Sequence, residues 1–123
     1  MSLTDAISIA ASGMNAASTL MDYTANNIAM ANTPNFLADA ADLQPLPTGG
    51  VGVDSLSLSD VAGTDGESNM VLSNEFQNLA EERQFYDANA AVVSITDQMY
   101  GNLLDVVSNA TSDSDSSDQV SGL

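Results

Sequence analysis

Cysteine, histidine, lysine and tryptophan are all absent from this sequence of 123 residues. Without cysteine, the chain forms neither disulfides nor thiolate metal sites. Without histidine, it lacks the commonest general base and the commonest metal ligand. No apolar run reaches the ~18 residues that a membrane-spanning helix needs, and the first residues lack the basic and apolar regions of a secretory signal. We therefore expect no direct membrane insertion and no conventional secretion, which leaves a signal-independent export route open.

Basic residues are nearly absent as well. One arginine, Arg83, stands against seventeen acidic residues, and the net charge is −16. Because nucleic acids bind through cations placed against their phosphates, we expect no nucleic-acid partner, and anionic lipid surfaces are disfavoured for the same reason. Three interpretations of the acidity stay open: solubility, a saline habitat that screens the self-repulsion, and an acidic surface that meets a basic partner.

The groups that catalysis requires are also scarce. Glu81 and Glu82 are adjacent, so on a helix they point ~100° apart and cannot share a substrate. Glu75 and Glu82 share one helix face, but no second element supplies a convergent group. The Asp/Ser run at residues 113–118 lacks the Gly and the Glu that a calcium-binding EF-hand loop requires. We therefore expect no enzyme activity, no metal site and no cofactor.

Two long segments have the apolar spacing of helices. Alternate steps of four and three from Leu3 to Ala31 meet apolar residues at eight of nine positions, which is the pattern of a coiled-coil seam. The same stepping continues from Leu72 to Val107, where Arg83 and Asp97 interrupt it. The large side chains on these two tracks are the candidate interface residues: Leu3, Ile7, Met14, Met21 and Ile28 in the first segment, and Phe76, Leu79, Tyr86, Val93, Tyr100 and Leu104 in the second.

A second apolar track runs along the second segment. It consists of Phe85, Val92, Met99, Leu103 and Val106. Two tracks on one helix indicate that the helix can face more than one neighbour.

Between the two segments the helical period is lost. Pro34 ends the first helix, and Asn32 suits a left-handed position at that end. Residues 51–58 alternate in polarity and predict a short strand, so the middle is either a small β element or an extended linker, and a loop that gains order on assembly is a further alternative. Residues 109–123 are rich in Ser and Asp, which is typical of a disordered acidic tail.

The predicted fold is therefore mainly α. We expect an antiparallel helical hairpin, in the manner of a coiled coil, from which the middle segment projects at one tip. Residues 1–34 form the N-terminal helix, residues 35–68 an irregular or β-containing connector, and residues 69–108 the C-terminal helix of the same domain. Residues 109–123 form the tail.

Four asparagines stand out because Asn is a poor helix former. They are Asn26, Asn27 and Asn32 near the end of the first helix and Asn89 in the second. Their amides either bond to local backbone or bridge to neighbouring chains and set the register, so all four join the candidate interface residues. Arg83 likewise has two readings, a surface pair with Asp87 or an ion pair with a carboxylate on another helix.

Motifs at both ends resemble one protein family. Residues 12–17 read SGMNAA and residues 25–36 read ANNIAMANTPNF, which is similar to the N-terminal signature of bacterial flagellar rod and hook proteins, SGM-A followed by ANNIANANTPGY. Residues 86–90 read YDANA and residues 96–105 read TDQMYGNLLD, and they resemble the family's C-terminal YEANAKVI and TADEMLGTLLDL. Met30, Asn35 and Phe36 stand where the family has Asn, Gly and Tyr, and the family's usual Arg falls on Gln84. The middle of the chain shows no such likeness.

The resemblance implies a structural subunit of the flagellar basal-body rod, of the small proximal-rod kind. Such subunits leave the cell by the flagellar type III export apparatus and pack their terminal helices into a tube that serves motility. The implied partners are the export apparatus, other rod and hook subunits, and further copies of the chain, and the implied location is the basal body outside the cytoplasm. The alternative is a helical-hairpin binding or regulatory protein that derives from rod proteins and does not polymerise.

Overall fold

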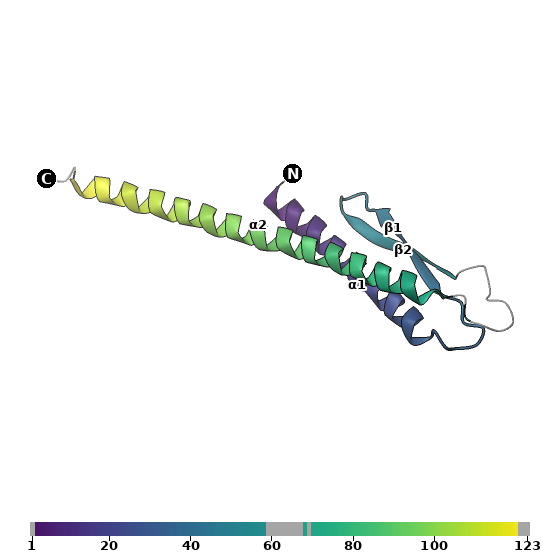
Figure 1. The fold of residues 1–123 in the computed structure, drawn as a ribbon. Coiled ribbons are helices and arrows are strands. Elements are labelled where there is room, and N and C mark those ends of the chain that lie inside the picture. The colour runs from purple at the N-terminus through teal and green to yellow at the C-terminus, as the bar shows by residue number, and fades with distance from the viewer. Residues whose placement is uncertain (1, 59–67, 69, 121–123) are drawn as a thin grey trace.

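The computed structural model describes residues 2–58, 68 and 70–120, and contains four elements. They follow in the order α1 (Leu3–Ala29), β1 (Asp39–Pro45), β2 (Val51–Leu58) and α2 (Leu72–Val120). Figure 1 shows α1 lying against the first half of α2, while the second half of α2 runs on past the N-terminus. The predicted fold class, a mainly helical hairpin with a small β element in the middle, is confirmed.

Helix α1 begins with a complete capping box. The Asp5 backbone N–H donates to Ser2 Oγ at 3.0 Å, and the Ser2 N–H donates to the Asp5 carboxylate at 2.8 Å. These bonds satisfy amide groups that have no partner within the helix. Hydrogen bonds from the Ser2 backbone and from the Ser2 side chain to the carboxylate favour its charged form and lower the pKa of Asp5.

The end of α1 differs from the sequence-based prediction. The helix stops at Ala29, before Asn32 and Pro34. The residue in the left-handed region is Asn35, with φ 58°, and not Asn32. Turns between residues 30 and 35 replace the expected last helical turn, since the Ala31 and Thr33 N–H groups bond three residues back, to Ile28 and Met30.

Strands β1 and β2 form an antiparallel hairpin with a bulge between Asp42 and Leu43. The strand predicted at residues 51–58 is confirmed as β2. Gly49 and Gly50 close the turn with φ of 85° and 94°, a conformation that glycine adopts without steric cost. The sequence did not predict β1, because Asp39–Pro45 contains none of the β-branched or aromatic residues that favour strands.

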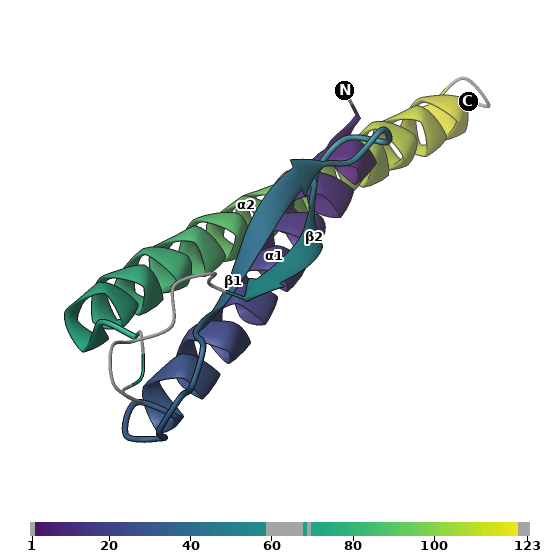
Figure 2. The same ribbon diagram turned by 90° about the vertical axis from the view of Figure 1, so that its right-hand side faces the viewer.

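The sequence predicted that the middle segment projects from one tip of the molecule, but the β hairpin does not. Figure 2 shows it lying along α1, and both strands contact that helix. Near the turn, the Val51 N–H donates to Ser12 Oγ at 3.1 Å. Near the other end, Asp39 bonds to Asn27. These two attachments hold the connector against the helix.

Helix α2 extends beyond the predicted boundary at residue 108. It continues to Val120, so most of the segment predicted as a disordered tail is helical, and residues 121–123 lie outside the described part. Side chains there bond to the backbone of the preceding turn: Thr111 Oγ1 donates to the Val107 and Ser108 carbonyls, and Ser112 Oγ to the Asn109 carbonyl. Propagating an existing helix needs no new nucleus, whereas the prediction weighed only the lack of apolar residues.

Candidate assembly surface

The face of α1 that packs inward is made of small and polar side chains. Its buried residues are Ala10, Gly13, Ala16, Ala17, Thr24 and Asn27. Three alanines are the buried hydrophobic residues in the described part of the chain. Because these side chains are short, the two helices approach closely along this face.

On the side of α2 that faces α1, a polar residue recurs every seven residues. Glu75, Glu82, Asn89 and Thr96 are seven residues apart, and we call them the polar seam. Glu75, Glu82 and Thr96 are buried, and Asn89 is half-buried. Buried polar groups are tolerated only where they have hydrogen-bond partners. The residues of α1 that face the polar seam therefore need to supply such partners.

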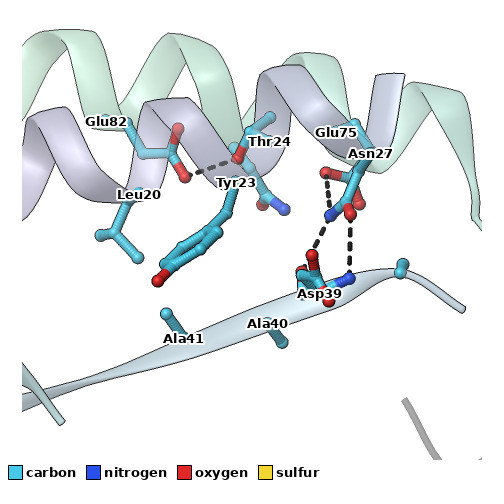
Figure 3. Close-up of a pocket in the computed structure, with 11 residues that line it drawn as sticks. Leu20, Tyr23, Thr24, Asn27, Asp39, Ala40, Ala41, Glu75 and Glu82 are labelled. Carbon is cyan, nitrogen blue, oxygen red and sulfur yellow. Dashed lines mark hydrogen bonds between the residues drawn. The ribbon is translucent and has the colours of Figure 1, made fainter. Parts of the chain in front are cut away.

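The strongest polar junction joins three elements at Asn27. Its Nδ2 donates to the Asp39 carbonyl at 2.8 Å and to Glu75 Oε2 at 3.2 Å, and its Oδ1 accepts from the Asp39 N–H at 2.8 Å. Figure 3 shows this amide between α2 and β1. One side chain of α1 thus fixes the start of α2 and the start of the hairpin together.

Thr24 and Glu82 form the next junction. Thr24 Oγ1 donates to Glu82 Oε1 at 2.9 Å. Glu82 Oε2 has no hydrogen-bond partner in the described part of the chain and is buried. Burial raises the pKa of Glu82, with smaller contributions from the charges of Glu75 and Glu81, and the Thr24 bond opposes the shift.

The helices approach most tightly where Gly13 meets Asn89. A Cβ atom on Gly13 would lie 2.7 Å from the Asn89 amide, so only glycine fits without a shift. The amide is itself anchored, because Asn89 Nδ2 donates to the Phe85 carbonyl at 2.8 Å. At the far end of the contact, Thr4 Oγ1 and the Tyr100 hydroxyl are 2.8 Å apart.

The predicted α1 residues lie beside the buried face. The large side chains Leu3, Ile7, Met14, Met21 and Ile28 are each half-buried. Gly13 and Asn27 take the buried places that the prediction gave to Met14 and Ile28. Of the nine stepped positions, three are buried, at Ala10, Ala17 and Thr24, and at two others the buried residue lies one place earlier.

Helix α2 shows the same displacement. Leu79, Tyr86 and Val93 are half-buried, as expected of seam residues. Phe76 is 54 % exposed, because Glu75 takes the inward place, and Arg83 is exposed beside buried Glu82. Tyr100 and Leu104 are also exposed.

The four asparagines separate into different roles. Asn27 makes the three-way junction within the chain, and Asn89 bonds to local backbone. Asn26 and Asn32 lie exposed near the end of α1. A role in bridging to other chains stays a prediction for these two.

The outer surface of α2 carries most of the large apolar side chains. Phe85, Val92 and Met99, which we call the outer track, are exposed, as is Ile95 between them. The second apolar track that the sequence predicted is therefore exposed on α2. Phe85 also lines a shallow depression with Glu81, Gln84 and Ala88 of the same helix. This surface is the one available for association.

A cavity of about 310 Å³ lies between α1, α2 and β1. Figure 3 shows Tyr23 pointing into this space toward β1, with Glu82, Thr24 and the Asn27 junction on the helix side. Among the described residues, no three acidic side chains come close enough to hold a metal ion. The described part of α1 and α2 also contains no stretch apolar enough to cross a membrane.

The sequence matches none of the protein-family models or curated proteins with which it was compared.

Proposed function

We propose that this chain is a structural subunit of the bacterial flagellar basal-body rod, which assembles through the outer surfaces of its terminal helices. Its partners would be other rod and hook subunits and copies of itself, after export by the flagellar type III apparatus. The proposal makes it a building element for motility and not an enzyme.

One observation supports assembly above all: the monomer hides its small side chains and exposes its large ones. The buried hydrophobic residues of the described chain are alanines, no large side chain is fully buried, and α2 exposes eleven large apolar residues. They are Leu72, Phe76, Phe85, Val92, Ile95, Met99, Tyr100, Leu103, Leu104, Val106 and Val107. An apolar surface of this extent is typical of a chain that associates with others.

The two end motifs also meet in space. Gly13 of the SGM motif lies against Asn89 of the YDANA motif. Residues that resemble one family at both ends thus form a single contact in the folded chain. This pairing supports the resemblance to one family.

Asn35 supports the resemblance at a place where the sequence departs from the family. The family has glycine at this position, and Asn35 adopts a φ of 58°. Glycine is the default residue for that conformation, and asparagine is among the few others that adopt it readily. Asn35 therefore adopts here a conformation that the family's glycine could also adopt.

The test compares two aspartate variants in the organism that encodes the chain. Phe85→Asp places a charge on the outer track without touching α1, because Phe85 is 61 % exposed. We expect the purified variant to keep the melting curve of the wild type, but to be missing from isolated basal bodies and to abolish motility. Gln98→Asp, an exposed polar residue of the same helix, adds the same charge and should incorporate normally.

A different result would favour the alternative function. If wild-type cells yield basal bodies without the chain, and its deletion leaves motility intact, the chain is not a rod subunit. A helical hairpin that binds or regulates another protein would then be the better description, and it should purify as a stable monomer.

A further inference from the structure

Beyond Tyr100, α2 has no neighbour among the described residues. Helix α1 begins at Leu3, and its first turn meets α2 at the Thr4–Tyr100 hydrogen bond. Helix α2 continues to Val120, and Figure 1 shows this part running free of the rest of the molecule. We call residues 101–120 of α2 the overhang; its side chains from residue 101 to residue 113 are all exposed.

The first part of the overhang, residues 103–107, carries an exposed apolar arc. Leu103, Leu104, Val106 and Val107 are 54 %, 71 %, 65 % and 52 % exposed. At ~100° per residue these four cover roughly 160° of the helix, and Asp105 lies on the opposite side. The apolar arc is wider than the ~100° stripe with which a surface helix faces one neighbour.

This arc continues an interface that already exists in the molecule. Steps of three and four lead from Tyr86, Val93 and Tyr100, which face α1, onward to Leu104 and Val107. The outer track continues in the same way from Met99 to Leu103 and Val106. A helix placed on the overhang would therefore extend along α2 the line of contact that α1 occupies.

The negative charge of the chain favours a positively charged partner for the overhang. From Gln84 to the end of the printed sequence there is no basic residue. Asp105 and Asp113 lie in the overhang, and Asp97 lies just before it. A second copy would bring another net charge of −16, which opposes close pairing at moderate salt. A helix with lysine or arginine beside its apolar stripe instead brings the opposite sign.

We propose that the overhang binds an amphipathic helix of a different, basic protein and not a second copy of this chain. The inference rests on the proposed function only in taking the helix surfaces to be assembly surfaces. It adds that the neighbour at this end is a different chain, with cationic residues on both sides of an apolar stripe.

Two synthetic helical peptides test the proposal with the full chain. Both carry the same leucine stripe, which is flanked by lysines in one and by glutamates in the other, and binding is followed by fluorescence anisotropy. We expect the lysine peptide to bind at least about tenfold more tightly than the glutamate peptide, and its affinity to fall between about 0.05 M and about 0.5 M salt.

A matched pair of variants locates the binding site. Leu104→Asp should weaken the lysine peptide by about tenfold or more, even though it adds a favourable negative charge. Asn102→Asp, on the polar side of the same turn, adds that charge without removing apolar surface and should bind at least as well as the wild type.

Two results would overturn the inference. One is equal binding of both peptides, or binding that Leu104→Asp leaves unchanged. The other is a dimer of the chain that strengthens with salt and is lost in Leu104→Asp, since the occupant would then be a second copy. Neither result affects the outcome of the Phe85→Asp test. Absence of the chain from basal bodies would contradict the rod assignment but would leave the peptide result unchanged.

Discussion

The two halves of α2 differ in the side chains that they present to a neighbouring helix. In the half that faces α1, the inward positions are Glu75, Glu82, Asn89 and Thr96, and the contact is close and polar. In residues 103–107 of the overhang, the exposed side chains include Leu103, Leu104, Val106 and Val107. The comparison teaches that the centre of the contact between α1 and α2 contains no fully buried large apolar side chain in the described part of the chain. The geometry of this contact comes from small residues and hydrogen bonds, and the apolar surface of α2 remains for a partner.

The magnitudes agree with that division. Burying one large apolar side chain contributes roughly 1.5–3 kcal/mol, so the four overhang residues together could contribute on the order of 10 kcal/mol. Association costs about 4–15 kcal/mol in lost freedom of motion. The apolar arc alone is thus close to balance, and opposite charge on the partner would decide whether the complex forms.

The largest expected effect comes from separating α1 from the half of α2 that packs against it. Gly13→Leu should destabilise the chain by about 3 kcal/mol, because any side chain at this position meets Asn89 and overpacking displaces the helices. Thermal unfolding followed by circular dichroism measures the change. Gly101→Leu is the control, since a Cβ there meets nothing within 4 Å. Equal melting curves for both variants would show that α1 and α2 do not meet at Gly13.

The next effect concerns the three-way junction. Asn27→Ala removes bonds to Asp39 and Glu75, and we expect a loss of about 2 kcal/mol because buried partners remain unsatisfied. Urea unfolding of this variant and of Asn26→Ala, its exposed neighbour, provides the comparison. Asn26→Ala should change stability by less than about 0.5 kcal/mol. Similar losses in both would remove Asn27 from the centre of the packing.

The polar seam was visible in the sequence, although it was not recognised. Glu75, Glu82, Asn89 and Thr96 recur every seven residues, but apolar residues are usually the ones assigned inward, so Phe76 was predicted there instead. The deciding information was on the other helix, where Gly13 allows an approach too close for Met14. Periodicity thus predicted both helices and a minority of the inward positions of each, and the other positions depended on how near the partner helix came.

The connector was harder to predict than the helices. Its second strand showed alternation in the sequence and is confirmed as β2. Its first strand has no local β signal and exists because it pairs with β2 and attaches to Asn27. Long-range contacts of this kind leave no mark in the local pattern.

A smaller effect follows from the raised pKa of Glu82. The folded chain holds this proton more tightly than the unfolded chain, so the stabilisation is complete below about pH 4.3, the ordinary pKa of glutamate, and is lost as the pH rises through the raised value. Glu82→Gln should therefore melt higher than the wild type at neutral pH and lose part of this pH dependence. Glu81→Gln removes the same charge from an exposed neighbour; if both variants gain equally, repulsion and not burial explains the effect.

The smallest effect should appear in the overhang. Gly101→Ala removes a glycine from a helix interior, which stabilises the helix locally by about 0.5–1 kcal/mol. Because residues 101–113 pack against nothing described, we expect slower hydrogen exchange of their amides, by up to about fivefold, with the main melting transition unchanged. A shift of that transition would mean that the overhang and the paired half unfold as one unit.

The single basic residue, Arg83, provides a protease site that reports on the opening of α2. Trypsin cuts after lysine and arginine, so it has one site in this polypeptide, after Arg83, on the exposed side of α2 beside the buried Glu82. Cleavage requires that stretch of helix to unwind, so the rate of appearance of two fragments measures how often the middle of the paired half opens. A neighbour that covers this helix in an assembled structure would slow the cut, and one gel would then distinguish a free chain from an incorporated one.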